Sequence, residues 1–184
     1  SGRAYWISGA SGTGKTTVGR LIGLEIADEY AIDEIDAGAC TGAALREIER
    51  GWACRAIGAK SGRCYLINEA HGLRQDAIRQ LLVMLERIPS HVVVIFTTTI
   101  AGQEKLFADC DDSSPLISRC TVLSLAQRDL AKPFAAHCKA VAEREGLDGQ
   151  PVERYVRLIQ DCRQNLRMAL SRIEAGEMLK GGAE

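Results

Sequence analysis

A glycine-rich segment near the start of the chain has the composition and spacing of a phosphate-binding loop. It fits Gly-x4-Gly-Lys-Thr without a mismatch and stands between a short apolar run and an amphipathic stretch. Glycines let successive backbone N–H groups face phosphate oxygens, and a helix beginning here adds its positive end. The Lys15 ammonium would meet the outer phosphates, and the Thr16 hydroxyl would bind Mg²⁺. The predicted nucleotide-binding residues are Gly9, Ala10, Ser11, Gly12, Thr13, Gly14, Lys15, Thr16 and Thr17.

A second polar group, Asn68 and Glu69, directly follows the apolar run 64–67. Nucleotide-hydrolysing proteins with this loop place an Asp–Glu pair at such a strand end, where Asp helps to hold Mg²⁺ and Glu polarises the attacking water. Glu69 matches the second role, so we predict that it is catalytic. Asn68 matches the first role weakly, because a neutral amide is a poorer partner than a carboxylate for a hard cation.

Thr97, Thr98 and Thr99 end the next apolar run, 92–97. Threonine favours strands in any case, but ligands of α/β proteins collect at the carboxyl edge of the sheet. A hydroxyl there can reach the γ-phosphate or the attacking water. We predict that Thr98 does so, and we place Thr99 second.

Apolar runs alternate with helical stripes along the first two thirds of the chain, which predicts a parallel sheet with right-handed crossovers. The predicted strands are 4–7, 31–35, 64–67, 92–97 and 121–125. The stripe 78–85 predicts a helix that Pro89 stops. After Leu125 the pattern becomes helical only, with helices predicted at 131–145, 152–162 and 166–179. We therefore predict a five-stranded α/β core, 1–125, followed by a small all-helical lid domain, 126–184.

Charge and composition narrow the functional classes. Lys and Arg total 23 against 24 for Asp and Glu, which argues against a free-standing nucleic-acid binder. No apolar run approaches the roughly 20 residues needed to cross a bilayer, and no leader pattern opens the chain, so we expect a cytoplasmic protein without membrane partners. The seven cysteines are scattered without a CxxC pair, which predicts reduced thiols rather than a zinc cluster.

Several further motifs resemble those of the clamp-loader branch of the AAA+ ATPases. Within that branch they resemble the motor subunit of the bacterial replication clamp loader, which is part of DNA polymerase III. Glu34-Ile35-Asp36-Ala37 precedes a helix as in that family, and 65–73 (YLINEAHGL) resembles its acidic strand and turn. LLVMLERIP at 81–89 resembles the family's "LLKTLEEPP" helix. The most specific likeness is Ser118-Arg119-Cys120, which matches the Ser-Arg-Cys motif of the clamp-loader group.

The resemblance implies a P-loop NTPase fold of the AAA+ type that binds ATP and Mg²⁺ and hydrolyses ATP. It implies that Arg119 acts in trans on the ATP of a neighbouring subunit, and that Arg167, in the lid segment NLRMAL, senses the γ-phosphate. The implied partners are other AAA+ subunits in a ring, a sliding clamp and primed DNA.

The chain departs from that family in several places. It starts close to the first predicted strand, and it has no counterpart of the family's zinc-binding insertion or oligomerising collar. Gln164 and Asn165 stand where a glycine is expected before the lid arginine, and an acidic stretch, 109–112, precedes Ser118. These departures predict a trimmed or divergent relative.

Other functions share some of these sequence features. Asn68 favours a non-hydrolysing subunit that only completes a ring. A helicase loader or transposition ATPase would share the core without Ser-Arg-Cys, and a small nucleotide kinase would share only the phosphate loop. For contact with DNA the candidates are Arg46 and Arg50, with Lys60 and Arg63 nearby, although such spacing is also ordinary for a solvated helix face.

Overall fold

The computed structural model describes residues 2–99, 113–125 and 129–179. The chain divides into two compact units. The first comprises Ser1–Gly9 and Lys15–Leu125, and the second comprises Ala10–Gly14 and Ala126–Glu184. The glycine-rich segment is therefore divided, with its two ends in the first unit and its middle in the second.

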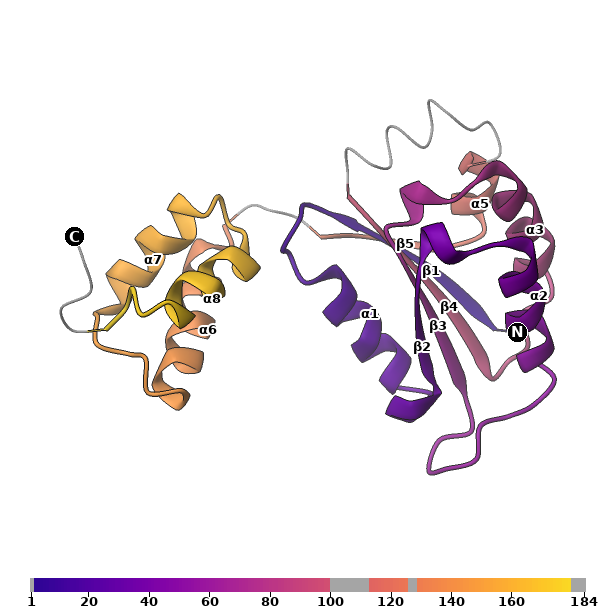
Figure 1. Cartoon of the computed structure of the whole chain (residues 1–184), viewed down its shortest axis with the longest axis horizontal. Helices are drawn as coiled ribbons and strands as arrows, with labels where there is room; N and C mark the ends of the chain where they lie inside the picture. The colour runs from indigo at the N-terminus through magenta and orange to yellow at the C-terminus, as the bar shows by residue number, and fades with distance from the viewer. Residues whose placement is uncertain (1, 100–112, 126–128, 180–184) are drawn as a thin grey trace. The chain divides into compact units, whose positions relative to one another are not determined.

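A five-stranded parallel sheet with the order β2-β3-β4-β1-β5 forms the first unit (Figure 1). This confirms the predicted α/β class. The strands are β1 (Arg3–Gly9), β2 (Ile32–Asp36), β3 (Arg63–Asn68), β4 (Val92–Thr98) and β5 (Thr121–Leu125). All seven residues of the central strand β4 are buried, as its uninterrupted apolar run predicts for a strand covered on both faces.

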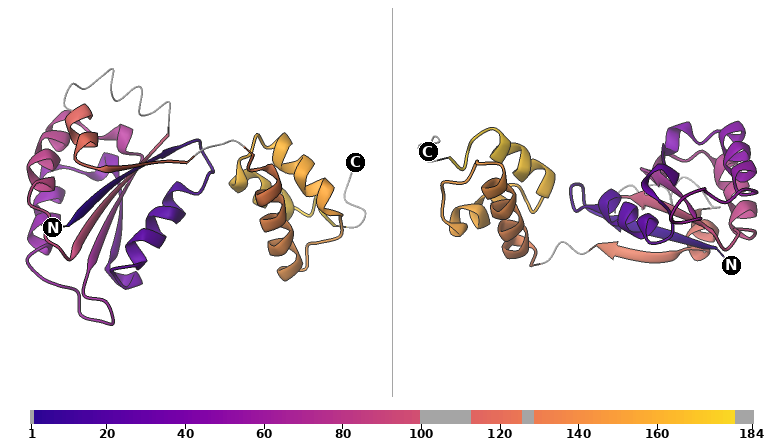
Figure 2. Two further views of the ribbon diagram at one scale, coloured as in Figure 1. Left: turned by 180° about the vertical axis from the view of Figure 1, so that it is seen from behind. Right: turned by 90° about the horizontal axis from the view of Figure 1, so that it is seen from below.

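Helices cover both faces of this sheet, with α1 (Lys15–Leu24) on one side and α2 (Gly42–Gly51) and α3 (Gln75–Leu85) on the other (Figure 2). Two glycines let α1 approach the strands closely. A Cβ at Gly19 would lie 2.8 Å from a methyl carbon of Leu66, and one at Gly23 would lie 2.7 Å from the sulfur of Cys64. The shorter helices are η1 (Glu29–Ala31), η2 (Ala37–Ala39), η3 (Ala70–Gly72) and α5 (Ser113–Ser118).

Three helices, α6 (Ala131–Arg144), α7 (Val152–Asp161) and α8 (Leu166–Glu174), form the second unit. Tyr155 is fully buried among them, and its hydroxyl donates to Asp148 at 2.7 Å. The ammonium of Lys139 donates to the other oxygen of Asp148, also at 2.7 Å. This satisfied polar cluster anchors the loop between α6 and α7. No helix in the described part of the chain is long and apolar enough to cross a bilayer.

The last helix is shorter than its apolar stripe predicts. We expected it to continue to Leu179, but α8 ends at Glu174. Gly176 has φ +89°, a left-handed conformation that commonly ends a helix. The side chains of Met178 and Leu179 that extend the stripe therefore lie on a turn rather than on the helix.

The cysteines in the described part of the chain are free thiols; Cys110 lies outside it. Cys64, on β3, is fully buried, and burial raises the pKa of its thiol to about 12. Burial likewise raises the pKa of Cys40 to about 11. These thiols stay protonated and unreactive near neutral pH.

Candidate nucleotide-binding site

The glycine-rich segment forms a tight turn after β1. Gly12 has φ +75° and Gly14 has φ +86°, conformations that side chains other than glycine rarely adopt. The Thr13 hydroxyl donates to the carbonyl of Ala10 at 2.8 Å. Glycine is therefore needed at these two positions of the turn, whereas phosphate binding by the turn stays a prediction.

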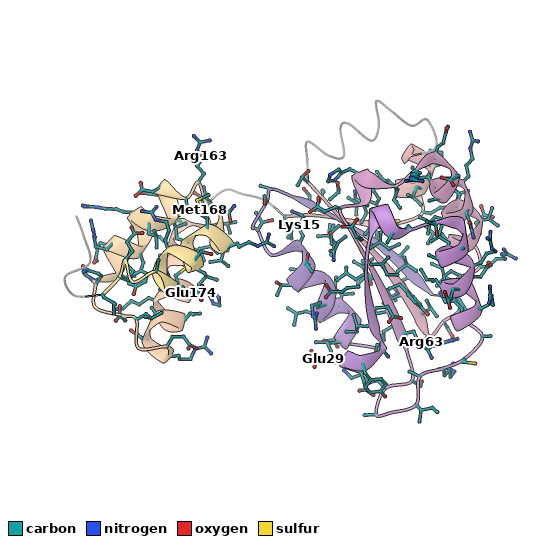
Figure 3. All side chains as sticks on the ribbon, in the orientation of Figure 1. Lys15, Glu29, Arg63, Arg163, Met168 and Glu174 are labelled. Atoms are coloured by element: carbon teal, nitrogen blue, oxygen red, sulfur yellow. The ribbon has the colours of Figure 1, made fainter. Side chains whose placement is uncertain are left out.

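Lys15 begins α1 (Figure 3) and is buried, with 8% of its surface exposed. Its ammonium donates to the carbonyl of Gly9 at 3.2 Å. The side chain thus folds back along the turn instead of extending into solvent. An ammonium held in this way is placed as a fixed positive charge beside the turn.

Asn68, at the end of β3, is the point where three elements meet. Its Oδ1 accepts a hydrogen bond from the hydroxyl of Thr16 on α1 at 3.2 Å, and another from Thr97 on β4 at 2.9 Å. The two predicted metal-binding residues are therefore adjacent. Thr97, which was not among the predicted site residues, joins them.

Thr97 and Thr98 point to opposite sides of β4, because successive strand residues alternate. Thr97 meets Asn68, whereas the fully buried Thr98 has its hydroxyl 3.2 Å from His71 Nδ1. Because both faces of β4 are buried, its residues do not alternate between apolar and polar. The sequence therefore could not predict which threonine faces Asn68. A role for Thr98 at the γ-phosphate stays a prediction.

Glu69 follows β3 in a left-handed backbone conformation, φ 54° and ψ 45°. Such a conformation is uncommon for a residue other than glycine and costs on the order of 1 kcal/mol or more. The carbonyl of Glu69 accepts from the backbone N–H of Gly72 at 2.8 Å, which closes the turn η3. One carboxylate oxygen lies 3.4 Å from His71 Nδ1.

The second unit contains the middle of the glycine-rich turn together with the start of α8. The carbonyl of Gly12 accepts from the N–H of Leu166 at 3.2 Å. Asn165 caps α8 by accepting from Met168 N–H at 3.1 Å, and its Oδ1 occupies the space that a Cβ at Gly12 would need. Arg167 lies two residues after Asn165 and is exposed. The lid segment predicted from the motif NLRMAL therefore contacts the turn through its backbone.

Arg119, predicted to act on a neighbouring subunit, lies just after α5 and pairs within its own chain. Its guanidinium donates to Glu86 at 2.7 Å and to the carbonyl of Pro115 at 3.0 Å. Both side chains are partly exposed, and ion pairs of this kind contribute only about 0–1 kcal/mol. The pairing therefore restrains Arg119 weakly.

Two of the basic residues considered for DNA contact have contacts within the fold. Lys60 donates to the carbonyl of Leu24, and Arg63 donates to the carbonyl of Cys54 at 3.1 Å. Arg46 and Arg50 are exposed on α2. Contact of any of the four with DNA stays a prediction.

The strand order, the glycine turn between β1 and α1, and the polar strand ends at Asn68 and Thr97 define a P-loop fold of the AAA+ type. The solved structures agree. A RuvB variant of Thermotoga maritima matches 94% of this chain and 53% of that chain, with a TM-score of 0.74 and 19% identity. A second variant of the same protein gives a TM-score of 0.75. At this identity the likeness concerns the fold alone.

The sequence relatives are subunits of DNA polymerase III. The gamma subunit of Buchnera aphidicola is 29% identical over 120 residues, covering 52% of this chain and 32% of that subunit. The tau subunit of Escherichia coli is 29% identical over 151 residues, covering 69% of this chain and 22% of that subunit. No family model matches the chain. The resemblance predicted from the motifs is thereby confirmed: the chain is similar to the gamma and tau subunits of DNA polymerase III, and it spans less than a third of their length.

Proposed function

We propose that this chain binds ATP with Mg²⁺ and hydrolyses it as one subunit of a clamp-loader-like AAA+ ring that acts on a sliding clamp and primed DNA. The observation that supports this most directly is the meeting of Thr16 and Asn68. It brings the helix after the phosphate loop to the strand end from which Glu69 projects. The similarity to DNA polymerase III gamma and tau subunits supports the clamp-loader setting.

Nucleotide binding would use the turn at Gly12 and Gly14 and the ammonium of Lys15. Backbone N–H groups in such a turn and the N-terminal end of α1 both favour an anion. Lys15 would exchange its contact with the Gly9 carbonyl for the outer phosphates, a stronger, charge-assisted interaction. Arg167 would add a second positive charge from the lid.

Magnesium fits the oxygen donors present, but it would depend on the nucleotide. The hydroxyl of Thr16 and the amide oxygen of Asn68 are the kinds of ligand that Mg²⁺ accepts, yet both are neutral. No group of three His, Cys, Asp or Glu side chains within the described ranges could hold a metal ion. Phosphate oxygens would therefore supply the negative charge. Bound Mg²⁺ would in turn neutralise charge developing on the phosphates.

Hydrolysis would use Glu69 to polarise the attacking water. Its side chain is about half exposed and lies one residue beyond Asn68 at the carboxyl edge of the sheet. A positioned general base contributes about 10²–10⁴ in rate. Arg119 of a neighbouring copy would complete the site by stabilising charge on the transferred phosphoryl group.

A second candidate function follows from Asn68 itself. Because the amide replaces a carboxylate, the chain could bind nucleotide and complete a ring without hydrolysing it. Both candidates predict nucleotide binding, and only the first predicts turnover.

The experiment that separates them measures ATP affinity and steady-state ATPase on the same preparation. Affinity is measured by calorimetric titration, and ATPase is measured against protein concentration with and without primed DNA. Turnover that depends on Glu69 and rises with concentration or DNA supports the motor. Binding without turnover under every condition supports the ring-assembly subunit, and failure to bind ATP refutes both.

A further inference from the structure

His71, in the turn η3, lies between two residues of the candidate site that come from different strands. Its Nδ1 is 3.2 Å from the Thr98 hydroxyl and 3.4 Å from a carboxylate oxygen of Glu69. Thr98 is fully buried at the end of β4, whereas Glu69 is about half exposed after β3. One ring nitrogen thus faces both a rigid hydroxyl and the predicted catalytic base.

The surrounding acceptors determine where the ring proton belongs. The Thr98 hydroxyl donates to the carbonyl of Thr99 at 3.2 Å, so its lone pairs are free to face His71. The Glu69 carboxylate accepts hydrogen bonds and donates none when ionised. A bare Nδ1 would oppose that carboxylate, so the arrangement favours a proton on Nδ1 that both oxygens share.

Glu69 needs such a partner if it is to act as a base. Its side chain is about half exposed and rotates about several bonds, so packing alone does not hold the carboxylate in one orientation. Its backbone is fixed in the left-handed region by the hydrogen bond from Gly72. The side chain is the part that remains to be oriented, and His71 is placed to orient it.

We propose that His71 is a positioning residue: its Nδ1–H holds the Glu69 carboxylate for water activation, and Thr98 fixes the imidazole ring for that task. The proposal rests on the proposed ATPase function. It gives Thr98 a part in the site that does not require contact with phosphate. It also makes the turn η3, rather than β3 alone, responsible for the geometry of the base.

The first test uses substitutions that differ in where they place a donor. His71→Ala should lower kcat by about ten- to a hundredfold, a part of what a general base contributes, and leave ATP affinity unchanged. His71→Asn places an amide nitrogen near the position of Nδ1 and should restore most of the rate. His71→Gln places its amide near Nε2 and should not. His137→Ala, at an exposed position on α6, is the matched control and should behave as the parent.

The second test asks whether His71 acts through Glu69. In a Glu69→Gln background, His71→Ala should cause no further loss of rate, because the carboxylate it positions is gone. An independent additional loss would overturn the proposal. So would equal rates for the Asn and Gln variants, or a His71→Ala variant that loses ATP affinity in proportion to its rate.

The third test does not require turnover. Long-range ¹H–¹⁵N NMR spectra of the nucleotide-free protein report which ring nitrogen carries the proton, and His71→Gln assigns the signal among the three histidines. We expect the Nδ1–H form for His71, and a shift away from it in Thr98→Val and in Glu69→Gln. An Nε2–H form unaffected by either change would overturn the proposal. If the parent binds ATP but never hydrolyses it, the motor function fails, and this spectrum still decides whether His71 holds Glu69.

Discussion

The Thr16 hydroxyl donates a hydrogen bond to Asn68 Oδ1 at 3.2 Å. This bond joins the first turn of α1 to the end of β3, although the two residues are 52 positions apart in the sequence. The contact places a neutral amide where related nucleotide-hydrolysing sites have a carboxylate. The amide oxygen also accepts from Thr97, so it is held from two sides. An acidic metal-binding strand end carries a negative charge at this position, and this site does not.

Replacement of Lys15 by Ala should weaken ATP binding by about tenfold or more, because hydrogen bonds to charged groups are worth about 1.5–3 kcal/mol and each 1.4 kcal/mol is tenfold. Calorimetric titration with ATP–Mg²⁺ measures the change. Lys132→Ala, which removes an exposed lysine at the start of α6, is the control for loss of charge alone and should bind as the parent does. Equal affinity for Lys15→Ala and the parent would refute the assignment of the phosphate loop.

Replacement of Asn68 by Asp should raise turnover or lower the magnesium concentration needed for half-maximal rate. A carboxylate suits Mg²⁺ better than an amide, and it keeps the oxygen that accepts from both Thr16 and Thr97. Steady-state ATPase across a magnesium titration compares the two proteins. An unchanged or lower rate in Asn68→Asp would show that the site is adapted to the amide or does not hydrolyse ATP.

Alkaline pH should destabilise the first unit through Cys64. Burial raises the pKa of this thiol in the folded chain to about 12, above the value of about 8.5 for an exposed thiol. A raised folded pKa means that the protonated thiol is retained on folding, so stability is unaffected below about pH 8.5 and falls between there and the folded pKa. Between pH 8 and pH 10 the loss should be about 2 kcal/mol.

Urea unfolding at pH 8 and pH 10 checks this value, with Cys64→Ala as the matched variant. The variant is less stable at both pH values because it leaves a cavity against α1, but its loss between them should be smaller than that of the parent. An equal loss in both proteins would assign the alkaline effect to other groups.

Much of the fold could be predicted from the sequence, since local signals and tertiary structure agree there. The apolar run of β4 is buried throughout, and the stripe 78–85 lies within α3. The glycine-rich motif and the polar end of the third strand also predicted that Thr16 and Asn68 belong to one site. In each of these features a single pattern in the sequence, either the placement of apolar residues or the spacing of a motif, determines the structure.

Other features depend on register and backbone conformation, which residue types do not determine. Alternation along β4 decides that Thr97 rather than Thr98 meets Asn68, but a strand buried on both faces shows no alternation. The left-handed backbone of Glu69 and its approach to His71 arise from the turn η3. The sequence does show a histidine two residues after Glu69. Only the distances from its Nδ1 to Glu69 and Thr98 indicate that it belongs to the site.

Arg119 provides the sharpest test of the ring. If it acts on a neighbour, ATPase activity should rise faster than linearly with protein concentration, and Arg119→Ala should remove that gain, since arginine fingers are worth about a thousandfold or more in rate. ATP affinity should stay unchanged. In mixtures, a Glu69→Gln chain should rescue an Arg119→Ala chain, because the two defects fall in different sites.

The contact with Glu86 allows a structural role for Arg119 to be separated from a catalytic one. Glu86→Gln removes the ion partner of Arg119 and leaves the guanidinium in place. If Arg119 only holds α3 to the segment after α5, Glu86→Gln should reproduce the loss seen in Arg119→Ala, and both should lower the melting temperature. If Arg119 acts in trans, Glu86→Gln should keep or raise the concentration-dependent activity, because freeing the guanidinium costs the chain little. Reduced ATP affinity in dilute Arg119→Ala would instead place the arginine at its own nucleotide and remove the main support for the ring.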